Sequence, residues 1–222
     1  MARFNWLWAW LGRARAYRLD AIHARILTPQ PTPLPPLSTP IEAKSPASPA
    51  ILPQPPITTR FEQSHDYHPY GDKARKIDLV VLHCTEGLLP GAVAWLTAKD
   101  ATPVSAHYLV SKAGDLVQMV AENDLAFHSG GTKEKPATWK GRVQINARSI
   151  GVELENRNDG RDPYPPAQLA VCLWLVIRTC RRFGLTAEQV IGHADVDPGR
   201  KTDPKNFSWD SFRSSLSQYL QA

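Results

Sequence analysis

The chain has 222 residues, of which 42% are hydrophobic and 21% charged, and its formal net charge is +5. This length accommodates one sizeable domain with an appendage and excludes a large multidomain machine. Residues 1–57 alone contribute +4, so the rest of the chain is close to neutral. A nucleic-acid-binding domain concentrates basic residues on its folded surface, so we expect no nucleic-acid partner. An anionic membrane or cell-wall surface suits the basic segment better.

Residues 1–27 form a basic, tryptophan-rich segment. Their apolar side chains recur at roughly helical spacing with arginines between them, and indole rings such as those of Trp6, Trp8 and Trp10 settle at membrane headgroups. The pattern predicts an interfacial basic helix, with a poorly ordered tail as the alternative. The apolar stretch at 4–11 is too short to span a bilayer and is at the short limit for a secretory signal.

A proline-rich stretch follows this segment. Eleven of the 20 prolines lie between Pro29 and Pro56, in a run of Pro, Thr, Ser and Leu without a period. Residues 28–57 are therefore predicted to be an extended, polyproline-like linker. Residues 58–222 are predicted to form the folded domain.

The folded domain alternates strands with helices. In chain order, the patterns predict a strand at 77–83, a helix at 90–97, hairpin strands at 105–110 and 115–120, a strand at 149–155, a helix at 166–183, a short strand at 190–193 and a closing helix at 209–220. This order predicts an α/β domain with a mixed central β-sheet flanked by helices. Cys172 and Cys180 lie more than two helical turns apart, so no disulfide joins them.

Two histidines end predicted apolar strands. His83 stands at the carboxyl end of the first strand, where open α/β sheets build their sites. His193 ends the short strand and precedes an irregular loop that contains Asp195, Asp197 and Asp203. Two histidines and one loop carboxylate, with an open fourth position, are a natural zinc set. Spacing alone does not choose among the aspartates, and a core histidine bonded to the backbone is the alternative for His83.

Two glutamates lie in the predicted strand at 149–155. Alternation places Glu153 and Glu155 on one face of this strand and its apolar residues on the other. One interpretation is that both carboxylates face solvent. The other is that one of them is a general base, because a carboxyl group that borders a cleft has a raised pKa. Lys201 offers a cation near any metal bound by the aspartate loop.

Five motifs occur together in this order: Val-Val-Leu-His83-Cys-Thr, Ser-Ala-His107-Tyr, Ala-Phe-His128-Ser-Gly, Ser-Ile-Gly-Val-Glu153-Leu-Glu, and Gly-His193 followed by Arg-Lys-Thr-Asp-Pro. The set resembles the type 2 N-acetylmuramoyl-L-alanine amidases, a group that includes AmpD-like amidases, amidase-type phage lysozymes and peptidoglycan-recognition proteins. The resemblance covers about residues 60–218, so the basic segment and the linker lie outside it.

The resemblance implies a role for each matching residue. His83, His193 and Asp203 correspond to the zinc ligands, which chooses Asp203 over the other loop aspartates. Glu153 corresponds to the general base and is preferred to Glu155 on this ground. Lys201 corresponds to the residue that stabilises the oxyanion.

His107 and His128 are expected to line the substrate groove or to hold the zinc ligands by hydrogen bonds. Some relatives have a tyrosine where this chain has Ala106, so Glu153 has no such backup. The family's Trp-His pair is Phe127-His128 here, and its Asp-Pro-Gly-Pro is Asp-Pro-Lys-Asn after Thr202. Both departures border the groove and therefore bear on substrate preference.

The resemblance implies a zinc hydrolase that cleaves the amide bond between N-acetylmuramic acid and L-alanine of the stem peptide, in cell-wall degradation or remodelling or in phage lysis. A non-catalytic peptidoglycan-binding receptor of the same fold is the alternative, although such a receptor is expected to lack a ligand or the base. Intact peptidoglycan and soluble anhydro-muropeptide both stay open as substrates, and the basic segment with its linker favours the polymer. We expect a monomer of the cell envelope or periplasm, with the cytoplasm as the alternative.

Overall fold

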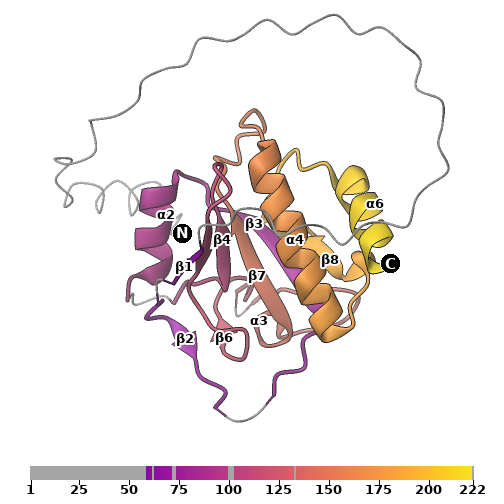
Figure 1. Cartoon of the computed structure of the whole chain (residues 1–222). Coiled ribbons are helices and arrows are strands. Elements are labelled where there is room, and N and C mark those ends of the chain that lie inside the picture. The colour runs from indigo at the N-terminus through magenta and orange to yellow at the C-terminus, as the bar shows by residue number, and fades with distance from the viewer. Residues whose placement is uncertain (1–58, 62, 72–73, 100–102, 133, 222) are drawn as a thin grey trace, which may run out of the picture. The chain divides into compact units, whose positions relative to one another are not determined.

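The computed structural model describes residues 59–221 except 62, 72–73, 100–102 and 133. The predicted basic segment at 1–27 and the predicted linker at 28–57 lie outside the described residues. Within the described part, no helix is both long and apolar enough to cross a membrane. Figure 1 shows a central sheet with helices on both faces.

Six strands form the central sheet, in the order β1-β5-β4-β7-β3-β8. All neighbours pair in parallel except β4 and β5, which form the predicted hairpin, so the predicted mixed sheet is confirmed. A separate antiparallel pair joins β2 and β6. The strands are β1 (Thr59–Phe61), β2 (Tyr67–His68), β3 (Leu79–Cys84), β4 (Tyr108–Val110), β5 (Leu116–Gln118), β6 (Leu125–Ala126), β7 (Ser149–Leu154) and β8 (Val190–Gly192).

The longest helix, α4, packs on one face of the sheet together with α6, as Figure 1 shows. Pro166 lies in its first turn, where the missing N–H costs nothing, and Gly184 ends it with a left-handed φ of 66°. Its buried side chains meet the residues of β3 and β7 that point to this face, such as Val80 and Val152. Each fully buried aliphatic side chain here contributes about 1.5–3 kcal/mol.

The helices of the described residues, in chain order, are α2 (Leu89–Thr97), α3 (Ile145–Arg148), α4 (Pro166–Phe183), the 3₁₀ helix η1 (Ala187–Gln189), α5 (His193–Val196) and α6 (Trp209–Leu220). The sequence pattern predicted α2, α4 and α6 within one residue of these bounds. It missed the short elements α3, α5 and η1. Elements of three or four residues hold too little hydrophobic periodicity to be recognised.

The other face of the sheet is covered by two separate apolar clusters. One contains α2 and residues of β4 and β5, and the other contains residues of α3 and α5 packed on Leu79 and Val81 of β3. On the same face, His83 follows Val81, and Glu153 follows Gly151 on the neighbouring strand. Polar side chains thus occupy the part of this face between the two clusters.

Two further predictions concern the cysteines and the end of the last strand. Cys84, Cys172 and Cys180 are all buried free thiols, which confirms the absence of a disulfide between the two helical cysteines. The prediction that the last strand extends to His193 is wrong. The strand ends at Gly192, because the Asp195 carboxylate accepts the Gly192 N–H at 2.8 Å and His193 starts the helix α5.

Candidate metal centre and active site

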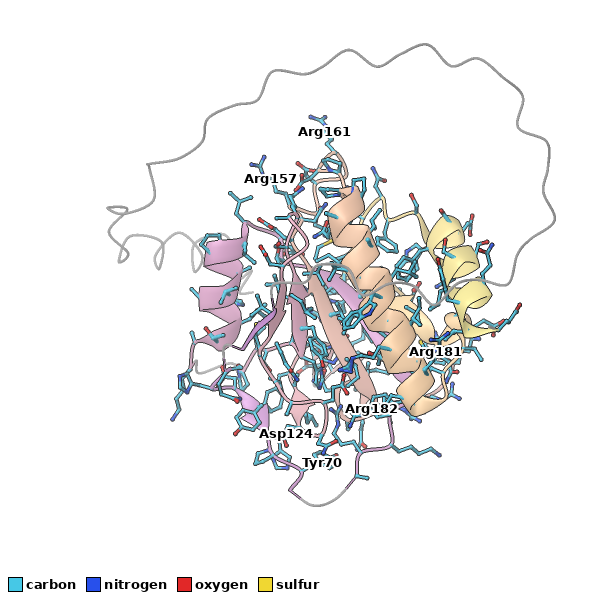
Figure 2. The ribbon with its side chains drawn as sticks, viewed as in Figure 1. Tyr70, Asp124, Arg157, Arg161, Arg181 and Arg182 are labelled. Atoms are coloured by element: carbon cyan, nitrogen blue, oxygen red, sulfur yellow. The ribbon has the colours of Figure 1, made fainter. Side chains whose placement is uncertain are left out.

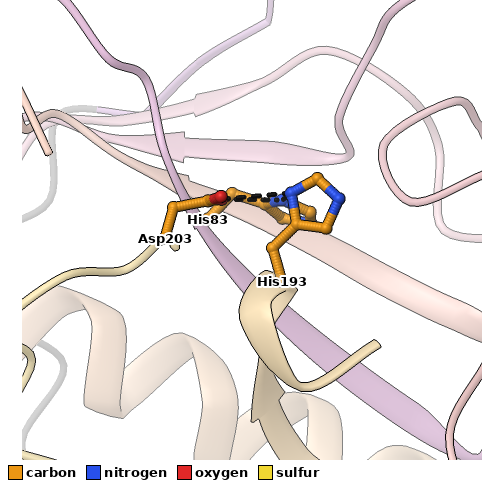
Figure 3. A group of neighbouring side chains, drawn as sticks. All are labelled: His83, His193 and Asp203. Atoms are coloured by element: carbon orange, nitrogen blue, oxygen red, sulfur yellow. Dashed lines mark hydrogen bonds and ion pairs between the residues drawn. The ribbon is translucent and has the colours of Figure 1, made fainter. Parts of the chain in front are cut away.

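Three side chains that are distant in sequence converge at one buried point. One potential ligand atom from each of His83, His193 and Asp203 lies within 4.8 Å of the other two (Figure 3). The two Nδ1 atoms are 3.0 Å apart, and Asp203 Oδ2 lies 3.1 Å from Nδ1 of His193 and 3.5 Å from Nδ1 of His83. All three residues are at most 5% exposed. The structure therefore brings together the three residues that the resemblance implied, as a buried metal-binding triad.

Backbone pairing explains why the two histidines meet. β8 is parallel to β3, with Leu82 opposite Gly192. The next residue along each chain segment is a histidine, and both histidines therefore lie at the carboxyl end of the sheet. Asp203 comes from the loop before α6. Its carbonyl oxygen accepts the Ala194 N–H at 3.0 Å, which fixes this loop against the start of α5.

The other two aspartates of the loop have structural contacts instead. The Asp195 carboxylate accepts the N–H of Gly192 and caps α5. The Asp197 carboxylate forms an ion pair with Arg200, three residues further along the chain. Neither belongs to the triad, so the geometry agrees with the choice of Asp203.

Two residues of the triad, His83 and Asp203, have shifted pKa values, and both shifts favour a bound cation. Burial lowers the pKa of His83, the nearby His193 adds to this effect and Asp203 opposes it, and the net pKa is about 4. His83 is therefore neutral near pH 7. Burial raises the pKa of Asp203, but its contacts with the imidazole rings of His193 and His83 outweigh this effect, so the net pKa is below the usual value. Asp203 is therefore an anion beside neutral imidazole.

Glu153 lies opposite His83 on the neighbouring strand β7. Among the described residues, its buried Oε2 atom has no hydrogen-bond partner. Burial raises the pKa of Glu153, the Asp203 carboxylate adds to the increase and the charge of Lys201 opposes it, and the net pKa is about 8. Lys201 is thus close enough to influence both Glu153 and His83 electrostatically. A buried carboxyl group with a raised pKa is a chemically suitable proton acceptor.

Glu155, the alternative to Glu153, has both carboxylate oxygens occupied. Oε1 accepts the N–H of Leu89, the first residue of α2, at 2.9 Å. Oε2 accepts the N–H of Lys112, in the turn after β4, at 2.8 Å. Glu155 therefore joins α2 and the hairpin to the end of β7, and this contact distinguishes it from Glu153.

His107 is completely buried, with both ring nitrogens in contact with protein atoms. Its Nδ1 accepts the Gly151 N–H at 3.0 Å, and its Nε2 lies 3.1 Å from the carbonyl oxygen of Asp124. Burial and, to a smaller extent, the nearby Arg75 lower the pKa of His107 to about 3. Of the two roles expected for this histidine, the geometry favours holding the framework of the site over lining a groove.

His128 contacts a triad member directly. Its Nδ1 lies 3.0 Å from Nε2 of His83, and its Nε2 lies 3.1 Å from the hydroxyl oxygen of Ser149. Burial lowers the pKa of His128 well below 6.5, and the rings of His83 and His107 add to this effect. The neutral ring therefore matches the expectation of a histidine that holds a metal ligand by a hydrogen bond.

Three residues around the site were not assigned a role from the sequence. Ser149 and Gly151 lie on the same face of β7 as Glu153, so strand alternation could have found them. Arg75 is buried and donates hydrogen bonds to the backbone carbonyls of Asn146 and Ser149, at 2.7 and 2.8 Å. Its Nη1 atom also lies 3.0 Å from Nε2 of His107. No pattern pointed to Arg75, because most of its partners are backbone atoms.

Comparison with known proteins identifies relatives along most of the described chain. The model of a family described as N-acetylmuramoyl-L-alanine amidase (Amidase_2) matches residues 73–206, a range that includes every site residue discussed above. The N-acetylmuramoyl-L-alanine amidase AmiD of Escherichia coli is 34% identical over 143 residues, which are 58% of this chain and 49% of AmiD. The 1,6-anhydro-N-acetylmuramyl-L-alanine amidase AmpD of Haemophilus influenzae is 34% identical over 115 residues, or 51% of this chain and 59% of AmpD.

Solved structures agree with these matches. The complex of Escherichia coli AmiD with anhydro-N-acetylmuramic acid-L-Ala-D-γ-Glu-L-Lys superimposes with a TM-score of 0.58 at 30% identity, and covers 67% of this chain and 60% of that one. A crystal structure of AmpD gives a TM-score of 0.60 at 27% identity, and covers 75% of this chain and 99% of that one. The chain spans about half the length of the relatives AmiD and AmpD that match by sequence. The family match extends over more than half of its residues, and the chain belongs to the N-acetylmuramoyl-L-alanine amidase family.

Proposed function

We propose that this protein is a zinc-dependent amidase that hydrolyses the bond between N-acetylmuramic acid and L-alanine of the stem peptide. The observation that carries the proposal is the buried His-His-Asp triad with Glu153 opposite it, in a chain that belongs to this family. A non-catalytic receptor would not require a buried carboxyl group with a free oxygen beside the triad.

The triad fits zinc in geometry and in donor type. Bonds of about 2.0–2.1 Å in a tetrahedral arrangement place ligand atoms about 3.3 Å apart, and the three separations here are 3.0, 3.1 and 3.5 Å. Two imidazoles and one carboxylate are a donor set of catalytic zinc sites, which leave a fourth position open. A bound Zn²⁺ polarises an amide carbonyl and lowers the pKa of a coordinated water to about 7.

The protein's own residues supply the proton transfers. Glu153, whose Oε2 has no protein partner among the described residues, accepts the proton of the attacking water and delivers it to the leaving amine of L-alanine. Lys201 faces the negative charge that develops on the carbonyl oxygen. Because this charge exists mainly in the transition state, the lysine contributes to the rate more than to substrate affinity.

Charged residues near the site suit a muropeptide. Figure 2 shows Arg157 and Arg161 in the loop that follows β7, at the end of the sheet where Glu153 lies, whereas Arg181 and Arg182 lie toward the other end. Arg157 and Arg161 are exposed. We infer that they meet carboxylates of the stem peptide, since the substrate held by AmiD contains a γ-linked glutamate.

The N-terminal segments support an action on the wall polymer. A basic, tryptophan-rich segment at 1–27 followed by a proline-rich linker at 28–57 suits a domain that works at a distance from an anionic surface. We propose the cell envelope or periplasm as the location, and peptidoglycan or its fragments as the partner.

Incubation of the purified protein with peptidoglycan sacculi and with a soluble anhydro-muropeptide tests the proposal. The expected result is release of peptides with a free L-alanine amine, abolished by a chelator and restored by zinc. Binding to sacculi without release of such peptides would favour the receptor. Full hydrolysis by rigorously metal-free protein would contradict the metal-dependent mechanism.

A further inference from the structure

A chain of hydrogen bonds runs from the metal triad into the protein interior. It joins His83 Nε2 to His128 Nδ1 over 3.0 Å, His128 Nε2 to Ser149 Oγ over 3.1 Å, and Ser149 Oγ to the carbonyl oxygen of Ile145 over 2.5 Å. All four residues are at most 8% exposed. Because water is excluded from each contact, the position of every proton in the chain is fixed by its neighbours.

The last contact sets the direction of the whole chain. The Ile145 carbonyl oxygen has no proton, so two oxygens 2.5 Å apart require the Ser149 hydroxyl proton between them. Ser149 Oγ is then left as the acceptor for His128. The Nε2 atom of His128 must therefore carry the proton of this contact.

A neutral imidazole has one N–H and one bare nitrogen. With the proton of His128 on Nε2, its Nδ1 is the acceptor for His83. The proton of the contact between the two rings then belongs to His83 Nε2. The Nδ1 atom of His83 is left with its lone pair directed at His193 Nδ1 and Asp203 Oδ2.

We propose that Ser149 and His128 are positioning residues that hold His83 in the tautomer whose Nδ1 can bind the metal. The positioning role rests on the proposed metal site. The order of the hydrogen bonds follows from the geometry alone and does not depend on that site. In the opposite order His83 Nδ1 would carry a proton, which must be displaced before a metal can bind. The deduced order leaves Nδ1 of His83 free of a proton and able to bind the metal.

The fold makes specific room for this arrangement. A Cβ atom at Gly151 would lie 2.5–2.7 Å from three ring atoms of His128, so no larger residue fits beneath the ring. The Asn146 side-chain oxygen accepts the backbone N–H of His128 at 3.1 Å and that of Ser129 at 2.6 Å. The ring and the backbone of His128 are thus both fixed, by residues of different segments.

Nuclear magnetic resonance of the full-length protein with ¹⁵N-labelled histidine tests the proton order directly. Long-range ¹H–¹⁵N correlations in the zinc-free protein are expected to show His128 and His83 each protonated at Nε2 and bare at Nδ1. The His128 signals are identified by their loss in His128→Phe. A proton on Nδ1 of either ring would overturn the proposal, whether or not the enzyme is active.

Metal affinity tests the consequence for the site. Competition with a chromophoric chelator is expected to show a zinc dissociation constant about 10-fold higher for Ser149→Ala, since loss of such indirect support typically costs 10–100-fold. Ser129→Ala is the matched control. Ser129 is also buried, and its hydroxyl oxygen has no hydrogen-bond partner among the described residues, so its zinc affinity should equal that of the wild type.

The outcomes separate this inference from the proposed function. Weaker zinc binding by folded Ser149→Ala, with the control unchanged, supports the positioning role even if the wild type hydrolyses no muropeptide. Equal affinity of Ser149→Ala and the wild type overturns it even if the wild type is a fast amidase. If a thermal melt shows that Ser149→Ala does not fold, the tautomers measured by nuclear magnetic resonance in the wild type decide whether the proposal holds.

Discussion

His83 and Glu153 are paired directly across two neighbouring parallel strands, β3 and β7. Neighbouring strands lie about 4.8 Å apart, and backbone hydrogen bonds on both sides hold this separation. The proposed ligand and the proposed base are therefore positioned by the sheet itself. Asp203 and Lys201, by contrast, come from a loop. The proposed proton transfer thus belongs to the rigid part of the site, and the proposed metal site and charge stabilisation are completed by the loop.

Replacement of Asp203 by alanine should abolish zinc binding and muropeptide hydrolysis, because it removes the only anionic ligand of the triad. Asp195→Ala is the matched control in the same loop. It removes the cap on the Gly192 N–H and should cost about 1 kcal/mol of stability while sparing zinc. Metal content and thermal melting of both variants check the prediction. Loss of zinc from Asp195→Ala alone would mean that the ligand was assigned to the wrong aspartate.

Glu153→Gln should retain zinc and lose about 10²- to 10⁴-fold in kcat, the range for a lost general base. Glu155→Gln should show the opposite pattern. Its amide cannot accept both the Leu89 and the Lys112 N–H, so stability should fall by about 1–3 kcal/mol with little change in kcat per folded molecule. Steady-state kinetics and thermal melts together separate the two. Equal turnover of Glu153→Gln and the wild type would assign the base to another residue.

Arg157→Gln should raise KM for a muropeptide about 2- to 5-fold, the loss of one exposed ion pair, and the effect should shrink at high salt. Arg181→Gln, an exposed arginine toward the other end of the domain in Figure 2, is the control and should leave KM unchanged. An equal rise of KM in both variants would point to a general charge effect on substrate encounter, contrary to a local contact.

Removal of residues 1–57 should leave zinc content and turnover on a soluble muropeptide unchanged, since every proposed site residue lies in the remaining domain. Binding to anionic vesicles should fall, because each basic residue near such a surface contributes about 1 kcal/mol, and salt should weaken the binding of the full-length protein. Co-sedimentation of both proteins at low and high salt measures this. Identical binding by the two would show that the segment at 1–27 has no anchoring role.

The sequence predicted the long elements and the triad well, for two different reasons. Helix α4 has enough turns for its apolar period to be clear, and the prolines and Gly184 mark its ends. The ligands followed from motifs that resemble a family. Composition and spacing left Asp195, Asp197 and Asp203 as equal candidates. The resemblance chose Asp203, and the contacts of each carboxylate in the fold agree with that choice.

The contacts of Arg75 and the contact between His128 and Ser149 could not be predicted from the sequence. The guanidinium of Arg75 is buried among the carbonyls of Asn146 and Ser149, and carbonyl positions depend on the tertiary fold. The bond from His128 to Ser149 joins a loop to the start of β7, 21 residues away. Such contacts have no spacing rule, so a sequence motif can mark these residues without indicating what they touch.

The order of the ligands along the chain has a consequence for synthesis. His83 lies near the start of the folded domain, and Asp203 follows it 120 residues later. The complete ligand set therefore exists only after Asp203 has been made, so metal binding by all three ligands cannot guide the folding of the segments made before it. Instead, a bound ion would stabilise the finished fold by joining β3 to the loop before α6, by about 2.7 kcal/mol when free metal is at 100 times its dissociation constant.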